Sequence, residues 1–205
     1  MNIKNVQRFI DEWNDTLQIV YTLTEEIKKA NQVVNIEIGR LKNKNENEFL
    51  REMQPWFRIV IRSTIATIEA ICYKFKQVTI LICDHRKKPL TPTEQEKLTE
   101  KKQDEDGKLR NYYLETKENI KFALKKIYYA LDLRFEIEDH EGWKKLLDTI
   151  DIRHKLTHPK KKVDLDVSPQ QYNNTTIGFN WFEKKIKELN KLSSLKFKLS
   201  GIQRL

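Results

Sequence analysis

Apolar residues recur at intervals of three and four along most of the chain, which is the spacing of amphipathic α-helices. A first such helix is predicted over about 6–30. The polar, Asn-rich stretch 41–48 predicts a loop, and Pro55 is expected to open a long central helix that reaches about Cys83 and ends before Pro89. Apolar side chains occur on most faces of this helix, so we expect the other helices to cover it.

Four further helices are predicted after the central one. Thr91 is a candidate N-cap with Pro92 in the first turn, and this short charged helix should end near the acidic run 104–107. The segment 171–179 is ambiguous, with a brief hairpin as one interpretation, although Ser168-Pro169 just before it is a candidate helix start. The remaining helices are expected over 109–135, 141–157 and 180–192.

The composition favours an all-α protein. The chain has 205 residues, of which 39% are hydrophobic, and only five glycines and five prolines. That is enough apolar material for one real core and little of the turn material that a sheet-rich protein needs. We therefore expect an up-and-down helical bundle in one domain, with an N-terminal helix (1–40) packed on a helical core (49–160) and a basic C-terminal loop and helix (161–205).

Several classes of protein are disfavoured by what the sequence lacks. No apolar run approaches the ~18 residues of a membrane-spanning helix, and the N-terminus has no secretory pattern. We expect a soluble, cytoplasmic protein in which Cys72 and Cys83 stay reduced and buried on one helix. Phosphate-binding glycine loops and the C-x-x-C and H-E-x-x-H metal signatures are absent from the sequence, so no cofactor is predicted.

Positive charge is concentrated near the C-terminus. The formal net charge is +9, and from Arg153 to Leu205 there are twelve Lys or Arg against four Asp or Glu, a difference of 12 − 4 = +8. Such a region attracts polyanions, of which nucleic acid is the commonest in a cytoplasm. A lysine-rich solvated surface has the same composition, so charge alone does not identify a ligand.

The segment 152–159, IRHKLTHP, is the most informative part of the chain. At about 100° per residue, an apolar helical stripe should continue into polar side chains one turn before the helix is stopped by Pro159. Burying an arginine and two histidines costs several kcal/mol unless they gain partners, and this suggests a functional site. The apolar members are Trp143, Leu146, Leu147 and Ile150, and the polar ones are Arg153, His154, Thr157 and His158.

This segment resembles the R-x4-6-H motif of the HEPN superfamily, a group of small α-helical proteins that includes metal-independent ribonucleases of toxin–antitoxin and phage-defence systems. The resemblance covers about 140–160 and extends more loosely to the helical pattern from about residue 50. It implies a HEPN-like fold, RNA cleavage, and a homodimer in which two motif helices face each other, with an antitoxin or regulatory protein as a further partner. The sequence departs from the family at His154, where asparagine is common.

The chemistry of the motif residues suits RNA self-cleavage. A 2′-hydroxyl that attacks the adjacent phosphorus needs a proton acceptor, a proton donor for the departing 5′-oxygen, and positive charge beside the non-bridging oxygens. His158 is the candidate acid or base, Arg153 the phosphate stabiliser and His154 an orienting residue. Thr157 and Glu69 are supporting candidates, and RNA contacts are expected from Lys155, Lys160, Lys161 and Lys162.

Other interpretations remain open at this stage. Arg153 is also the kind of helix-end arginine that bonds a carboxylate, and His158 the kind of C-cap that satisfies carbonyls. Glu69 interrupts an apolar run and would need a cation such as Arg153 or Arg62 if it faces inward. His154 and His158 have the spacing of two metal ligands on a helix, but further ligands have no clear place in the sequence. A non-catalytic helical module that binds a protein, a nucleotide or RNA is the alternative function.

Overall fold

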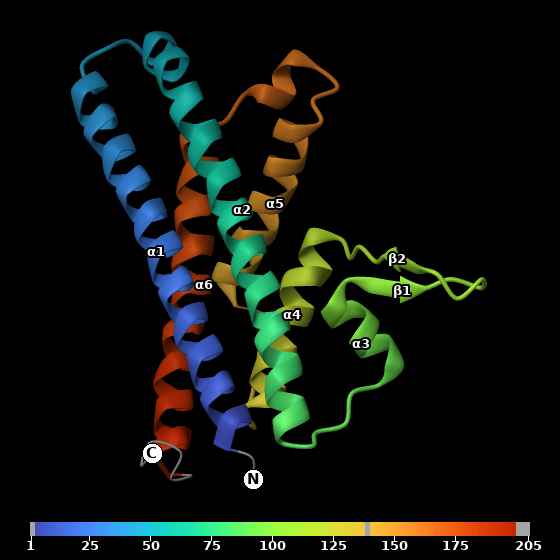
Figure 1. The fold of residues 1–205 in the computed structure, drawn as a ribbon. Helices are drawn as coiled ribbons and strands as arrows, with labels where there is room; N and C mark the ends of the chain where they lie inside the picture. Colours follow the sequence, from blue (N-terminus) through green and yellow to red (C-terminus); the bar gives the residue numbers. More distant parts are fainter. Residues whose placement is uncertain (1–2, 138–139, 200–205) are drawn as a thin grey trace. The chain divides into compact units, whose positions relative to one another are not determined.

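The computed structural model describes residues 3–137 and 140–199, so the last part of the predicted C-terminal segment, 200–205, lies outside the described residues. Within them the fold is all-α, as predicted, with six α-helices, a 3-10 helix η1 and one two-stranded hairpin (Figure 1). In chain order the elements are α1 (Ile3–Leu41), α2 (Glu46–His85), α3 (Pro92–Thr99), β1 (Lys101–Gln103), β2 (Leu109–Asn111), α4 (Thr116–Ala130), α5 (Glu141–Thr157), η1 (Lys162–Leu165) and α6 (Pro169–Leu199).

The chain divides into two compact units, and each is assembled from separate stretches of sequence. The first unit comprises Met1–Val20, Glu69–Glu136 and Lys187–Leu205, and the second comprises Tyr21–Ile68 and Ile137–Ile186. Helices α1, α2 and α6 contribute residues to both units. The motif and the whole of α5 belong to the second unit.

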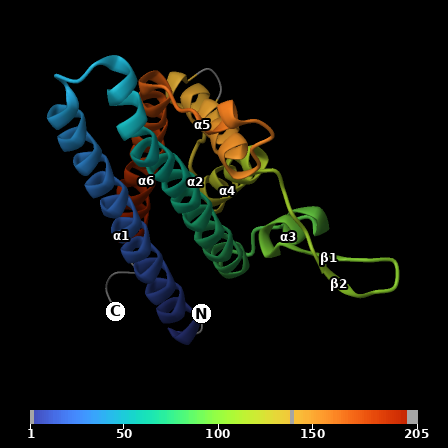
Figure 2. The ribbon, with the colours of Figure 1, turned by 90° about the horizontal axis from the view of Figure 1, so that it is seen from above.

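The second unit has a core formed by parts of α1, α2, α5 and α6, which lie alongside one another in both ribbon views (Figures 1 and 2). The rings of Phe57 and Tyr172 stack with centroids 4.9 Å apart, and the Tyr172 hydroxyl donates to Asn31 Oδ1 at 2.9 Å. Burial of this apolar surface is the main force that holds α5 against α2. The core residues are Val34, Leu41, Met53, Phe57, Val60, Ile61, Ile152, Leu156, Val167 and Tyr172.

Two glycines allow α5 and α6 to approach closely. A Cβ added at Gly178 of α6 would lie 2.8 Å from the backbone nitrogen of Leu146, and one at Gly142 of α5 would overlap Trp181 Cβ. One turn beyond the Gly178 contact, the hydroxyls of Thr149 and Thr175 lie 3.4 Å apart. The lack of a side chain at both glycines therefore sets how deeply the motif helix packs on α6.

The first unit contains α3, the hairpin and α4 beside the second half of α2. Thr91 caps α3 in a reciprocal capping box with Glu94, as the Thr-Pro-Thr-Glu sequence predicts. Lys76 is 1% exposed on α2 and forms an ion pair of 2.9 Å with Glu100, while Lys126 of α4 pairs with Glu94. These ion pairs connect α3 and the residue after it to the two longer helices.

The predicted end of the first helix and the predicted start of the second were wrong. The first helix continues to Leu41 and α2 already starts at Glu46, so Pro55 lies inside α2 rather than at its start. Pro55 has no N–H for the carbonyl of Arg51, but Met53 and Phe57 on either side of it are fully buried. Burial of the flanking side chains outweighs the lost hydrogen bond, and the helix continues through the proline.

The predicted helix over 109–135 was also wrong in its first part. Residues 109–111 form β2, which pairs antiparallel with β1, and α4 begins only at Thr116. Asp104 accepts the backbone N–H groups of Asp106 and Lys108, and Gly107 has a positive φ of 79°. The acidic run is therefore a hairpin turn, which replaces both the end of one predicted helix and the start of the next.

The ambiguous segment 171–179 is helical. Helix α6 is continuous from Pro169, so there is no hairpin at this place. The Ser168 hydroxyl accepts the Gln171 N–H and the Gln171 side chain accepts the Ser168 N–H, a reciprocal cap at the candidate start. Tyr172 and Phe179 are buried and form part of the apolar face of this helix.

Both cysteines are free and buried on α2, as predicted. Burial raises the pKa of the Cys72 thiol and that of the Cys83 thiol, because a thiolate loses hydration in an apolar environment. None of the helices in the described part of the chain is long and apolar enough to cross a membrane.

Candidate functional site

Helix α5 has the bounds predicted from the sequence, Glu141–Thr157. His140 is the N-cap, and its Nδ1 accepts the Gly142 N–H at 3.0 Å. At the other end His158 is the C-cap, and its backbone N–H donates to the carbonyl of His154 at 3.0 Å. Pro159 follows directly, so the helix ends where the next residue cannot supply a helical N–H.

The two histidines of the motif lie next to each other. Their ring centroids are 5.2 Å apart with the ring planes tilted by 55°, and both side chains are exposed. This closeness arises because residues four apart occupy the same face of a helix. The end of α5 therefore presents two imidazoles together, each able to exchange a proton or accept a hydrogen bond.

The polar residues do not continue the buried stripe of α5, in contrast to the prediction. Arg153 is partly buried, but His154, Thr157 and His158 are exposed. In the last two turns the core is instead filled by Ile152 and Leu156, which pack in the apolar cluster with α2. Ile152 and Leu156 therefore form the buried face at this end of α5. The histidines and Thr157 stay in solvent, so the desolvation cost expected from the sequence does not arise.

Thr157, a predicted supporting residue, has a local partner. Its hydroxyl donates to the carbonyl of Arg153 at 2.8 Å, within the last turn of α5. This is the bond from a threonine hydroxyl to the carbonyl four residues earlier that is common within helices. Thr157 therefore contacts the last turn of α5, on which His154 lies.

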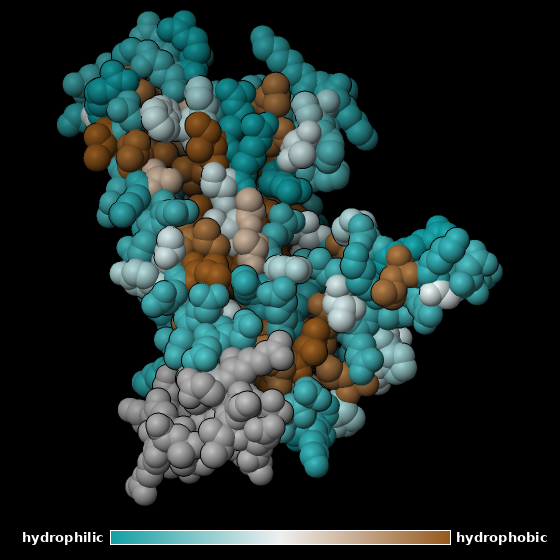
Figure 3. Space-filling model, in the orientation of Figure 1, coloured by the Kyte–Doolittle hydropathy of each residue, from teal (hydrophilic) through white to brown (hydrophobic). Residues whose placement is uncertain are grey.

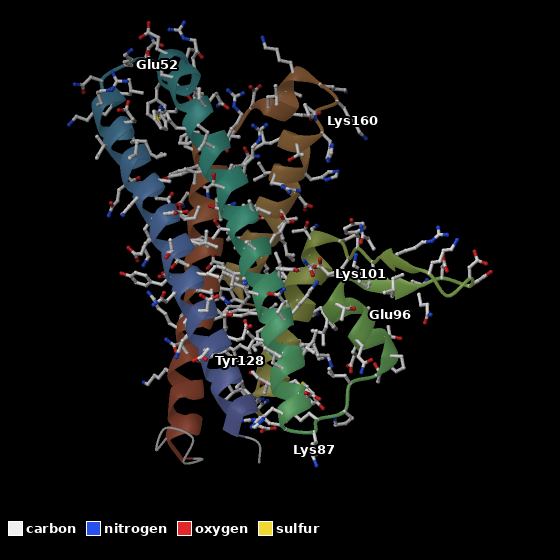
Figure 4. The ribbon with its side chains drawn as sticks, in the orientation of Figure 1. Glu52, Lys87, Glu96, Lys101, Tyr128 and Lys160 are labelled. Atoms are coloured by element: carbon white, nitrogen blue, oxygen red, sulfur yellow. The ribbon has the colours of Figure 1, made fainter. Side chains whose placement is uncertain are left out.

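The predicted RNA-contacting lysines surround the end of α5. Lys155 on the helix and Lys160, Lys161 and Lys162 after it are all exposed. Figure 4 shows Lys160 on the turn after α5 with its side chain directed outward. Together with Arg153, His154 and His158 these residues form what we call the basic end of the second unit.

Asp164 shapes the turn that carries the lysines. Its carboxylate accepts the backbone N–H groups of Lys160 and Lys161 at 2.8 and 2.9 Å. These two hydrogen bonds are the main reason why the pKa of Asp164 lies below its usual value, and the cations of Lys155 and Lys160 act in the same direction. Hydrogen bonds to Asp164 therefore hold the turn on which these lysines lie.

Two arginines of α2 that were not among the predicted site residues contact the same region. Arg62 Nη2 donates to the carbonyl of Leu156 at 2.5 Å, and Arg58 Nη1 donates to the carbonyl of Leu165 at 3.4 Å. The sequence carried a signal for this extension. Arg51, Arg58 and Arg62 are spaced so that they fall within about 40° of one another on one face of a helix. The basic end thus extends onto α2.

Glu69, the other predicted supporting residue, belongs to the first unit. It is partly buried on α2, and its Oε1 accepts the hydroxyl of Thr116 at 2.8 Å. Its suggested pairing with Arg153 or Arg62 stays a prediction.

A metal site at the two histidines would need further ligands. Among the described residues, no three His, Cys, Asp or Glu side chains converge closely enough to hold a metal ion. The imidazole pair alone supplies two donors, fewer than the three protein ligands of a catalytic zinc site.

Comparisons with protein-family models, curated proteins and solved structures gave no match. The resemblance of the motif to the HEPN superfamily therefore rests on the residues 152–159 and on their position at the end of a helix.

Proposed function

We propose that this chain is a HEPN-like, metal-independent endoribonuclease of the toxin–antitoxin or phage-defence type. The observation that supports this most directly is the exposed pair of imidazoles, 5.2 Å apart, on a turn that also carries Arg153. The basic end around them has the charge that a polyanionic substrate requires.

Each of the motif residues has a separate role in the proposed reaction. A base removes the proton of the RNA 2′-hydroxyl, the 2′-oxygen bonds to phosphorus, and the bond from phosphorus to the 5′-oxygen breaks as an acid protonates that oxygen. His158 serves as one of these two groups and His154 orients it, while Arg153 binds the non-bridging oxygens as their charge grows. The products are a 2′,3′-cyclic phosphate and a 5′-hydroxyl.

A homodimer completes this proposal. One acid–base group cannot stand on both sides of the phosphorus in an in-line displacement, and a second basic end facing the first would supply the other. Exposure of His154 and His158 in the single chain is compatible with such a partner, since neither is covered by the chain's own described residues.

The test is cleavage of tRNA and mRNA by the purified protein in excess chelator, with mapping of the ends. We expect 2′,3′-cyclic phosphate ends, a loss of at least about 100-fold in kcat for His158→Ala, and a loss of about 100- to 1000-fold for Arg153→Ala.

Matched controls are available in the first unit. His85→Ala removes a histidine at the end of α2, and Lys102→Ala removes an exposed cation of β1. Both should cleave like the wild type, with circular dichroism to confirm that every variant is folded. Equal cleavage by the wild type and His158→Ala would refute the assignment, and RNA binding without cleavage would favour the non-catalytic module.

A further inference from the structure

A groove of about 1080 Å³ lies in the second unit, beside the basic end. One wall comes from the start of α2 and the other from the segment that joins α5 to α6. Its principal lining residues are Phe49, Leu50, Arg51, Arg58, Val163 and Asp166. The groove exceeds the roughly 300–1,000 Å³ of a typical small-molecule site, so it has room for a nucleotide unit.

The groove and the basic end share two elements, α2 and the segment that follows α5. Arg58 lines it, and Arg62, one helical turn further along α2, bonds the carbonyl of Leu156 just before the motif's last residues. On the opposite wall Val163 directly follows Lys160–Lys162. Cationic side chains therefore occur beside both walls of the groove, on α2 and on the segment after α5.

The lining suits a base better than a phosphate. Glu46 and Asp166 balance the charges of Arg51 and Arg58, so the lining has no net positive charge that would select an anion. Apolar surface from Phe49, Leu50 and Val163 offers stacking and packing, while carboxylates and guanidinium groups match the amino and carbonyl edges of bases. Figure 3 shows mostly hydrophilic side chains around the C-terminal end of α5, with a small hydrophobic area among them.

We infer that the groove binds an unpaired base of the RNA, next to the bond that is cut, while the lysines after α5 hold the flanking phosphates. Bases within a duplex are paired and stacked and cannot enter such a groove, so the substrate class is single-stranded RNA. This inference rests on the proposed function, because it names the substrate of the same site.

The experiment measures binding separately from cleavage. His158→Ala protein is titrated into a fluorescent single-stranded RNA oligonucleotide and into the same sequence annealed to its complement, and anisotropy gives each Kd. Val163→Glu and Arg51→Gln are then added to that background. Val163 is 64% exposed, so a carboxylate there changes the groove rather than the core.

Val33→Glu on α1 is the matched control, because Val33 is also an exposed valine of the second unit, at 43%, and does not line the groove. We expect Val163→Glu and Arg51→Gln each to weaken single-strand binding about tenfold and Val33→Glu to have no effect. Duplex binding should be weaker throughout and insensitive to Val163→Glu.

Two results would overturn the inference. One is equal single-strand affinity for Val163→Glu and Val33→Glu, and the other is tighter binding of the duplex. Failure of the proposed function is distinguishable, because a wild type that does not cleave but binds single strands through Val163 and Arg51 keeps the groove assignment and loses only the catalytic one.

Discussion

At the scale of the residue, the position of the segment 152–159 at the end of a helix was predicted correctly, but the exposure of its polar side chains was not. The spacing in the sequence placed Arg153, His154 and His158 at a helix end, and the structure brings the two imidazoles together there. Their exposure was not predictable from periodicity, because Ile152 and Leu156 offered a second apolar face in the same turns. Which face is buried depended on α2, whose Met53 and Phe57 belong to the same apolar cluster as Ile152 and Leu156.

Asp164 gives a pH-dependent prediction at this scale. Its pKa lies below the ordinary 3.8, so its contribution to stability is present above that value and is lost as the pH falls through the lowered pKa. Asp164→Asn should therefore melt at a lower temperature than the wild type at neutral pH, and the difference should vanish well below pH 3.8.

Thermal melts followed by circular dichroism at the two pH values check this. Asp166→Asn is the control, since Asp166 is an exposed neighbour in the same turn, and it should match the wild type at both pH values. An Asp164→Asn protein with an unchanged melting temperature at neutral pH would show that the capped turn contributes nothing to stability.

At the scale of the element, helices with strong local signals were predicted well. Thr91-Pro92 marked the start of α3, and Pro159 marked the end of α5. The errors occurred where tertiary contacts overrode local signals, as at Pro55 inside α2. The hairpin was missed because its strands are three residues long and exposed, with no alternation of apolar side chains.

Replacement of glycine by alanine should have opposite effects on stability at an open position of α1 and at the contact between α5 and α6. Gly39→Ala on α1 should stabilise the protein by about 1 kcal/mol, because an added Cβ meets nothing within 4 Å and alanine is the better helix former. Gly178→Ala should destabilise it by about 1–3 kcal/mol, because the Cβ would meet the backbone of Leu146.

Urea unfolding of the two variants and the wild type measures both effects. Gly142→Ala should also destabilise, since its Cβ would overlap Trp181. If Gly178→Ala were as stable as Gly39→Ala, the close approach of the two helices would not exist in solution.

At the scale of the whole molecule, the all-α class followed from composition and periodicity, whereas the division into two units did not. Each unit is assembled from stretches far apart in the chain, and α1, α2 and α6 pass from one to the other. A change of unit within a continuous helix leaves no mark on apolar spacing, because the spacing continues through it.

The proposed dimer gives the prediction that belongs to this scale. The chain has a mass of 24.6 kDa, and light scattering coupled to size exclusion should give twice that value. His154→Lys together with His158→Lys should shift the mass toward the monomer, because each basic end would gain further positive charge facing the basic end of the partner. A wild type that stays monomeric at high concentration would contradict this arrangement.

Gln54 and Val167 have a consequence for how the protein is made. The Gln54 amide both donates to the Val167 carbonyl and accepts its N–H, each at 2.8 Å, across 113 positions of sequence. Ribosomes release the N-terminal part of a chain first, so this long-range clasp cannot close until the beginning of α6 has emerged. A growing chain therefore carries IRHKLTHP before the neighbouring turn can be fixed, and the surface is complete only once Val167 has emerged.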